Sequence, residues 1–164
     1  MKVPLSWVRE FVPLPDSLNP QEIVEKLVGL GFEVEGIIDL RNEIRGPIEV
    51  AQVLDIEEVK GQKKPIRYVK VAGSDERFVI CGAQNFTLGD FVVLALPGSV
   101  LPGNFAISAR ETYGKTSNGM ICSARELGMG DDHTGIIVLN SELAGVVRGN
   151  DAISLLNLHD VILD

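Results

Sequence analysis

Residues 117–128 read SNGMICSARELG, and no other run in the chain constrains the fold so narrowly. The apolar part, residues 120–122, has the length of a short strand and contains a cysteine of the buried type. Polar residues and then Leu127-Gly128 follow, which is typical of a short capped helix. The spacing therefore predicts a strand that runs into a capped helical turn. The run holds no catalytic geometry of its own.

Outward from this run, the middle of the chain consists of short β-type segments separated by Gly, Pro, Asn and Asp. We expect strands at residues 48–56, 66–71, 77–81, 91–96, 107–112 and 135–139. Residues 73–75 and 102–104 read as tight turns. Many short strands with little helix predict a small closed or partly open barrel.

The two ends of the chain have a different sequence pattern, which predicts helices as well as strands. Ser6 is expected to cap a short helix that Pro13 stops. A second helix is expected from Asn19-Pro20, a strong start signal, to Gly29. Residues 32–35 alternate in the manner of a strand and lead to residues 37–38.

The final residues, 160–164, read as a strand that returns to the sheet begun near Phe32. We therefore predict an α+β chain in which residues 1–40 plus 152–164 form a discontinuous α/β domain and residues 41–151 form an inserted barrel. Because the chain stops directly after a strand, we also expect it to be a fragment of a longer protein.

Length and composition indicate a soluble globular protein. The 164 residues are 45% hydrophobic and 23% charged, and a chain of this size needs no disulfide to fold. The longest apolar run, residues 91–97, is far shorter than a membrane span, and the first residues lack a signal-peptide core. We expect a cytoplasmic protein with no membrane contact, in which Cys81 and Cys122 are free, buried, reduced thiols.

Charge is unevenly distributed along the chain. The net charge is −8, but residues 1–40 carry −4, residues 131–164 carry −5 and residues 41–130 carry +1. Within that middle part, a run with no acidic residue contains five cations: Lys60, Lys63, Lys64, Arg67 and Lys70. Part of this acidic chain can therefore face a polyanion.

Motifs for covalent chemistry are missing from the sequence. Gly128-Met129-Gly130 lacks the Lys-Ser/Thr of a phosphate loop, and no Gly-x-Ser-x-Gly elbow occurs. Cys122 has no histidine in local reach, and the isolated Asp131-Asp132-His133 reads as a solvated turn rather than a metal site. We predict no catalytic residue, no metal and no cofactor in these 164 residues.

Binding is the positive signal. Lys70 shares its side of the predicted strand with Tyr68, which places a cation next to an aromatic ring, and this combination suits RNA. A second basic set lies near the 117–128 run. The candidate RNA-binding residues are Lys63, Lys64, Arg67, Lys70, Arg110, Lys115, Ser117, Asn118 and Arg125. The alternative is an ordinary solvated strand edge whose lysines discourage aggregation.

The number of cations limits the strength of such a contact. Five neutralised phosphates would give a salt slope of roughly −3.5, which fits weak, sequence-independent binding. An auxiliary RNA contact within a larger assembly is therefore expected, rather than a free-standing reader of bases.

Six blocks of sequence, in order, resemble the start of bacterial phenylalanyl-tRNA synthetase beta subunits. Besides residues 117–128 they are MKVPLSWVREFV (1–12), LGFEVEG (30–36), VICGAQN (79–85), ALPGSVLPG (95–103) and GDDHTGI (130–136). The resemblance implies an oligonucleotide-binding (OB) barrel of the tRNA-binding type, inserted into an α/β domain. It also implies a parent ligase of protein biosynthesis, an (αβ)2 heterotetramer whose alpha subunit carries the ATP- and Mg-dependent charging site.

The chain departs from the family pattern in one place. Many tRNA-binding barrels carry His-Pro-Asn-Ala-Asp-Lys/Arg-Leu where residues 60–68 here read KGQKKPIRY, which keeps cations but loses the pattern. The resemblance implies a non-catalytic tRNA-binding and scaffold segment. Two alternatives stay open: a structural module that packs against the alpha subunit or other domains without touching RNA, and a free-standing tRNA-binding chaperone.

Overall fold

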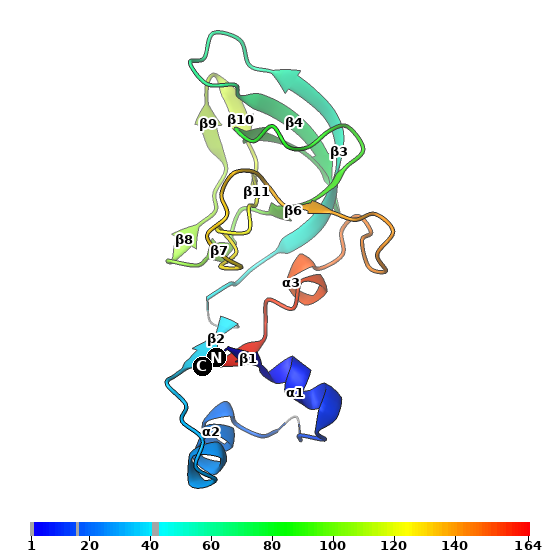
Figure 1. The fold of residues 1–164 in the computed structure, drawn as a ribbon. Coiled ribbons are helices and arrows are strands. Elements are labelled where there is room, and N and C mark those ends of the chain that lie inside the picture. Colours follow the sequence, from blue (N-terminus) through cyan, green and yellow to red (C-terminus); the bar gives the residue numbers. More distant parts are fainter. Residues whose placement is uncertain (1, 16, 41–42) are drawn as a thin grey trace. The chain divides into compact units, whose positions relative to one another are not determined.

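The computed structural model describes residues 2–15, 17–40 and 43–164, and they fold as two compact units (Figure 1). The end unit comprises residues 1–42 and 157–164, and the barrel unit comprises residues 43–156. No helix among the described residues is long and apolar enough to cross a membrane.

The barrel unit is built on an antiparallel sheet in the order β11-β6-β3-β4-β5, with β12 also paired to β6. These strands are β3 (Ile48–Glu58), β4 (Arg67–Ala72), β5 (Glu76–Cys81), β6 (Phe91–Ala95), β11 (Met120–Ile121) and β12 (Val138–Leu139). Strand β3 is the longest and pairs with both β4 and β6. A register shift between Val53 and Asp55 bends it, so that the sheet curls (Figure 1).

Successive side chains point to opposite faces of these strands, and those that point inward fill the barrel. Val69 and Val71 of β4 and Val79 of β5 are fully buried, and they pack with Val92 and Leu94 of β6 in one core cluster. The same alternation turns the intervening residues of β4 and β5 to the outer face.

The far edge of the sheet is closed by residues 117–118. The backbone N–H of Asn118 donates to the carbonyl of Phe78 (2.8 Å), and the N–H of Ile80 donates to the Ser117 hydroxyl oxygen (2.9 Å). Because β11 then pairs with β6, the sheet comes close to closing on itself. The antiparallel, nearly closed barrel that the sequence predicts is confirmed, and it fits an OB-type barrel.

Two hairpins and a short helix complete this unit. The strands are β7 (Val100–Leu101), β8 (Phe105–Ala106), β9 (Arg110–Thr112) and β10 (Lys115–Ser117), and the helix is α3 (Ala152–Leu155). Strands β7 and β8 pair around the 102–104 turn, and β4 and β5 pair around the 73–75 turn, so both expected turns are confirmed.

Four of the expected strands are confirmed to within two residues at each end, and two are much shorter than expected. In 107–112, strand structure starts only at Arg110, because the backbone of Ile107 bonds to the turn at Gly98 and Ser99. In 135–139 it starts only at Val138. The backbone N–H and carbonyl of Ile136 are taken by the Asn85 side chain (3.0 and 2.8 Å), and therefore cannot join a ladder.

The helix expected after residue 122 is reduced to turns. Glu126 accepts from the backbone N–H (2.7 Å) and the hydroxyl (2.8 Å) of Ser123, which is a cap. Gly128 and Gly130 then take positive φ values of 69° and 148°, and the chain leaves the helical path.

The end unit is a small three-stranded sheet with two helices. Its elements are β1 (Val3–Pro4), α1 (Leu5–Phe11), α2 (Pro20–Gly29), β2 (Ile37–Asp39) and β13 (Val161–Leu163), with strand order β1-β13-β2. The final strand and the second helix, with its Asn19 capping box, are confirmed. Leu5, Ile23, Val161 and Leu163 form the buried core.

Two expectations for the end unit are wrong. Ser6 does not cap the first helix: it lies inside α1, and its hydroxyl donates to Asp160 (2.5 Å). Residues 32–35 form no strand, because the N–H of Phe32 closes the end of α2 on Leu27 (3.0 Å) and β2 starts only at Ile37.

Candidate nucleic-acid interface

The outer face of β4 and β5 carries an aromatic pair between cations. In the β4–β5 ladder, Tyr68 lies opposite Ile80 and Lys70 lies opposite Phe78, so these four side chains share one face. The rings of Tyr68 and Phe78 stack with centroids 5.0 Å apart and planes at 16°. Phe78 is 42% exposed, which leaves ring surface open to a ligand.

The hairpin β9–β10 reaches this pair. The Lys115 ammonium lies 4.4 Å from the centroid of the Tyr68 ring, and the Tyr68 hydroxyl donates to the carbonyl of Thr116 (3.2 Å). At the other end of the hairpin, Arg110 lies over the ring of Phe105 at 5.7 Å. Both cations therefore fasten the hairpin to aromatic side chains of the barrel.

Three of the candidate cations are paired with carboxylates. Lys70 bridges to Glu76 (2.7 Å), Lys115 to Glu57 (2.9 Å) and Arg67 to Glu58 (3.0 Å). These carboxylates are 57–60% exposed, and exposed pairs of this kind contribute only about 0–1 kcal/mol. A phosphate can replace such a carboxylate at small cost.

Arg67 is held more firmly than Lys70 or Lys115. Its guanidinium lies 5.1 Å from the centroid of the Phe86 ring and donates to the carbonyl of Phe86 (3.0 Å). Its side chain is only 17% exposed, because it shares the inward side of β4 with Val69. This geometry gives Arg67 a role in packing the end of the barrel.

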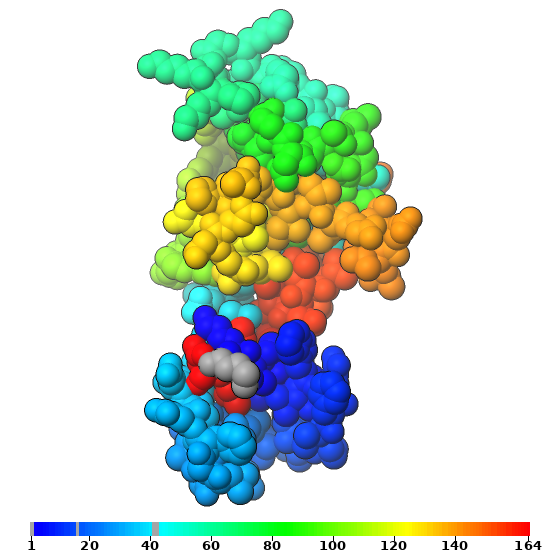
Figure 2. Space-filling model, viewed as in Figure 1, coloured from blue at the N-terminus to red at the C-terminus, as the bar shows by residue number. Residues whose placement is uncertain are grey.

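Lys63 and Lys64 lie in the exposed loop between β3 and β4, which is pinned at its base by a Val59–Ile66 backbone bond (2.8 Å). Within residues 2–15, 17–40 and 43–164, no carboxylate pairs with either ammonium group. Figure 2 shows the segment near residue 60, in turquoise, projecting at the top of the view. These are the cations most available to a polyanion.

The remaining candidate binding residues have different roles in the structure. The Ser117 hydroxyl is buried and, besides accepting from Ile80, donates to the carbonyl of Gly119 (3.1 Å), so it is a structural group. Asn118 contributes its backbone to closure of the sheet. Arg125 is exposed at a groove of about 840 Å³, which Phe105 and His133 also line. The structure thus gathers Lys70 and Lys115 around the aromatic pair, whereas Arg125 lies at the separate groove.

Sequence reasoning missed Phe78 and Phe105. In a strand, Phe78 points to the face opposite to that of its neighbour Val79. Because an apolar β-branched residue such as Val79 is expected to point inward, alternation alone would have predicted that Phe78 points outward. Phe105 gave no such signal, because its strand has only two residues.

Both cysteines are free and buried, as predicted. Burial raises the pKa of the Cys122 thiol to about 12, and the Glu126 carboxylate adds to the shift. Burial also raises the pKa of the Cys81 thiol. Neither thiol has the low pKa of a nucleophile.

We expect the folded chain to resist alkylation. With a pKa near 12, only on the order of 10⁻⁴ of Cys122 is thiolate at pH 8, and its sulfur is out of reach of reagent. Mass spectrometry after iodoacetamide treatment should find Cys122 unmodified in buffer and both thiols modified in guanidinium. Complete modification of Cys122 in buffer within minutes would contradict the buried position.

Comparison with known proteins agrees with this geometry. Residues 48–148 match the family described as "Putative tRNA binding domain", and the chain belongs to this family. The match begins at the first residue of β3 and includes the aromatic pair, the basic loop and the hairpin.

Similarity to longer proteins extends over the whole chain. It is 53% identical over 171 residues to the phenylalanine–tRNA ligase beta subunit of Streptomyces avermitilis and 51% identical over 170 residues to that of Thermobifida fusca, each match covering all of this chain. The beta subunit of Mycolicibacterium paratuberculosis is 51% identical over 167 residues, 99% of the chain. The chain spans about a fifth of the length of these relatives. The predicted resemblance to beta subunits is confirmed.

Proposed function

We propose that the barrel makes an auxiliary, non-catalytic contact to tRNA, with RNA lying across the outer face of β4 and β5. OB barrels bind oligonucleotides on their second and third strands and on the loop that joins the first two. In this chain, those parts are β4, β5 and the loop that carries Lys63 and Lys64. Membership of the tRNA-binding domain family supports tRNA as the ligand.

The stacked Tyr68–Phe78 pair is the observation that carries this proposal. An exposed ring beside cations matches the chemistry of single-stranded RNA, since bases stack on the ring and phosphates meet the cations. Phe78 offers the open ring surface, and Lys70 is its direct cross-strand neighbour.

Phe78→Ala tests the proposal. Loss of one stacking partner for a base costs about 1–3 kcal/mol, so the affinity for tRNA should fall roughly fivefold to over a hundredfold. Fluorescence anisotropy of labelled tRNA at low salt measures it. Leu88→Ala is the matched control, because Leu88 is 65% exposed and lies in the loop between β5 and β6, outside the two strands. An affinity within twofold of the unchanged chain, at an unchanged melting temperature, would refute the role of this face.

For the whole protein of which these residues would be a part, the proposal is based on the beta-subunit relatives. The barrel would be an insertion in the discontinuous α/β domain, and the whole would be part of a cytoplasmic phenylalanine–tRNA ligase that serves protein biosynthesis. ATP and Mg would be used by an alpha subunit in an (αβ)2 heterotetramer, and these residues would hold neither. The identity of about 50% to beta subunits over the full chain supports this setting.

A second candidate function is packing against another protein without RNA contact. It is favoured by the carboxylate pairs of Arg67, Lys70 and Lys115, which show that these cations already have acidic partners. Capture of a phenylalanine–tRNA ligase alpha subunit in the absence of RNA, unaffected by Lys63→Glu with Lys64→Glu, would support this role.

A further inference from the structure

The tip of the β9–β10 hairpin holds an aromatic residue in a backbone conformation that aromatic residues rarely adopt. Thr112 pairs with Lys115, so Tyr113 and Gly114 alone form the turn, and their φ values are 56° and 69°. A two-residue hairpin turn in which both φ values are positive strongly favours Asn-Gly, Asp-Gly or Gly-Gly. A bulky side chain at the first of these positions is strained.

Tyr113 is the exception among residues with this backbone conformation. In the described part of the chain, three residues other than glycine have a positive φ, and the other two are Asn104 and Asn157. Asparagine tolerates the conformation because its short polar side chain can hydrogen-bond locally, which a tyrosine ring cannot do. Backbone strain of this kind is concentrated at functional sites, where the side chain it positions has a use.

The ring of Tyr113 is open to a ligand. Tyr113 is 48% exposed. Among the described residues, no aromatic ring stacks on it, no cation lies over it and no hydrogen bond engages its hydroxyl. By contrast, the rings of Tyr68 and Phe105 each have a cation of this hairpin over them. Tyr113 therefore offers an aromatic surface that the barrel itself does not use.

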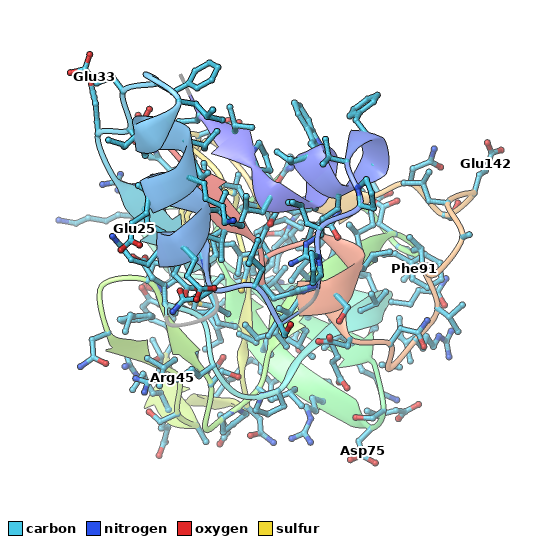
Figure 3. All side chains as sticks on the ribbon, turned by 90° about the horizontal axis from the view of Figure 1, so that it is seen from below. Glu25, Glu33, Arg45, Asp75, Phe91 and Glu142 are labelled. Atoms are coloured by element: carbon cyan, nitrogen blue, oxygen red, sulfur yellow. The ribbon has the colours of Figure 1, made fainter. Side chains whose placement is uncertain are left out.

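The hairpin tip lies at the basic end of the outer face of β4 and β5. Lys115, next to the turn, bonds to Glu57 (2.9 Å), the last residue but one of β3, and the loop with Lys63 and Lys64 follows β3 directly. Figure 1 shows the hairpin and this loop at the same end of the barrel. At the other end of β4 and β5, the turn presents Asp75, which is 76% exposed and projects outward in Figure 3. Phosphates are therefore drawn toward the end at which Tyr113 lies.

We propose that Tyr113 stacks on one base of the RNA strand that places another base on Phe78, so that the hairpin tip and the basic loop hold this strand from two sides. The inference rests on the proposed function and adds to it a contact residue outside the candidate cations and the stacked pair. A tyrosine ring can stack on any base, and its hydroxyl can donate to a phosphate or ribose oxygen. Because only unpaired bases can be splayed onto such rings, the bound part of tRNA is single-stranded.

Tyr113→Asn separates binding from stability. Asparagine suits the turn, so the melting temperature should rise by about 1–4 °C. The affinity for tRNA, measured by fluorescence anisotropy at low salt, should nevertheless fall roughly fivefold to over a hundredfold, because one stacked base is lost. Tyr113→Phe keeps the ring and should bind within about twofold of the unchanged chain. Leu143→Asn is the matched control, since Leu143 is 58% exposed on another loop of the barrel, and it should leave the affinity unchanged.

Fluorine NMR reports on the ring itself. The chain has two tyrosines, Tyr68 and Tyr113, so protein labelled with fluorotyrosine gives two signals, which Tyr113→Phe assigns. Addition of tRNA should shift the Tyr113 signal, because a base that stacks on the ring changes its shielding.

The outcomes distinguish this inference from the proposed function. An unmoved Tyr113 signal at saturating tRNA, or an affinity of Tyr113→Asn within twofold of the unchanged chain, would overturn the role of Tyr113. If Phe78→Ala still weakened binding, the outer face of β4 and β5 would stand without it. A lower affinity together with a lower melting temperature in Tyr113→Asn would also overturn the inference, since the tyrosine would then act by holding the hairpin. If neither Phe78→Ala nor Tyr113→Asn changed the affinity, the proposed function and this inference would fail together.

Discussion

Replacing Gly119 with alanine is expected to lower the free energy of unfolding by about 2–4 kcal/mol. Gly119 has φ +132°, a conformation that other residues rarely adopt, and an added Cβ would lie 2.8 Å from the carbonyl oxygen of Ala95. That carbonyl belongs to β6 at its pairing with Met120, so it cannot move without opening the β6–β11 ladder. Urea unfolding followed by circular dichroism measures the loss.

Gly130→Ala is the matched control for this substitution. Gly130 has a similar φ of +148°, but nothing lies within 4 Å of its added Cβ. Gly130→Ala therefore introduces backbone strain alone, and the free energy of unfolding should fall by about 1–2 kcal/mol. Equal losses for the two variants would show that the contact between Gly119 and β6 has no part in closing the barrel.

Reversing the charge of the basic loop is expected to have the largest effect on RNA binding. Lys63→Glu with Lys64→Glu removes two unpaired cations and adds two carboxylates, so tRNA affinity at low salt should fall more than about tenfold. The loss should be alike for all tRNAs, because phosphate contacts carry no sequence information. The salt slope should become shallower by roughly 1.4, since each cation removed takes away about 0.7. The starting slope should itself be nearer roughly −2 than the −3.5 expected from five cations, since Arg67 and Lys70 already have partners.

Lys2→Glu with Lys26→Glu makes the same change of net charge in the end unit. It should leave the salt slope unchanged. If this control weakens tRNA binding as much as the loop variant does, the chain responds only to its total charge, and the loop has no specific role.

The sequence motifs turn out to describe how the barrel is held together. In the 117–128 run, Ser117 fixes the closing edge, Gly119 permits close approach to β6, and Glu126 caps the turn at Ser123. Two other blocks meet through Asn85, whose amide pairs with the backbone of Ile136. The resemblance to beta subunits could therefore be recognised from residues that give little information about RNA contacts.

The strands that sequence predicted well are those with inward valines, such as Val69, Val71 and Val79, whose alternation is visible in one dimension. The hairpin β9–β10 has no such pattern, because it is polar and is held by Lys115 and Ser117 through contacts with distant residues. The carboxylate partners of Arg67 and Lys70 also could not be predicted from the sequence, because Glu58 and Glu76 become their neighbours only through the register of the strands. Candidate cations could be named from sequence, but not whether they are free.

Mapping tRNA onto the barrel by NMR would show which face of the barrel RNA occupies. With ¹⁵N-labelled protein at low salt, amide shifts should change in β4, in β5 around Phe78 and in the loop at residues 59–66. Residues 138–150 and the end unit should stay unperturbed. Changes confined to the groove at Arg125, or no change at any tRNA concentration, would contradict this placement of RNA.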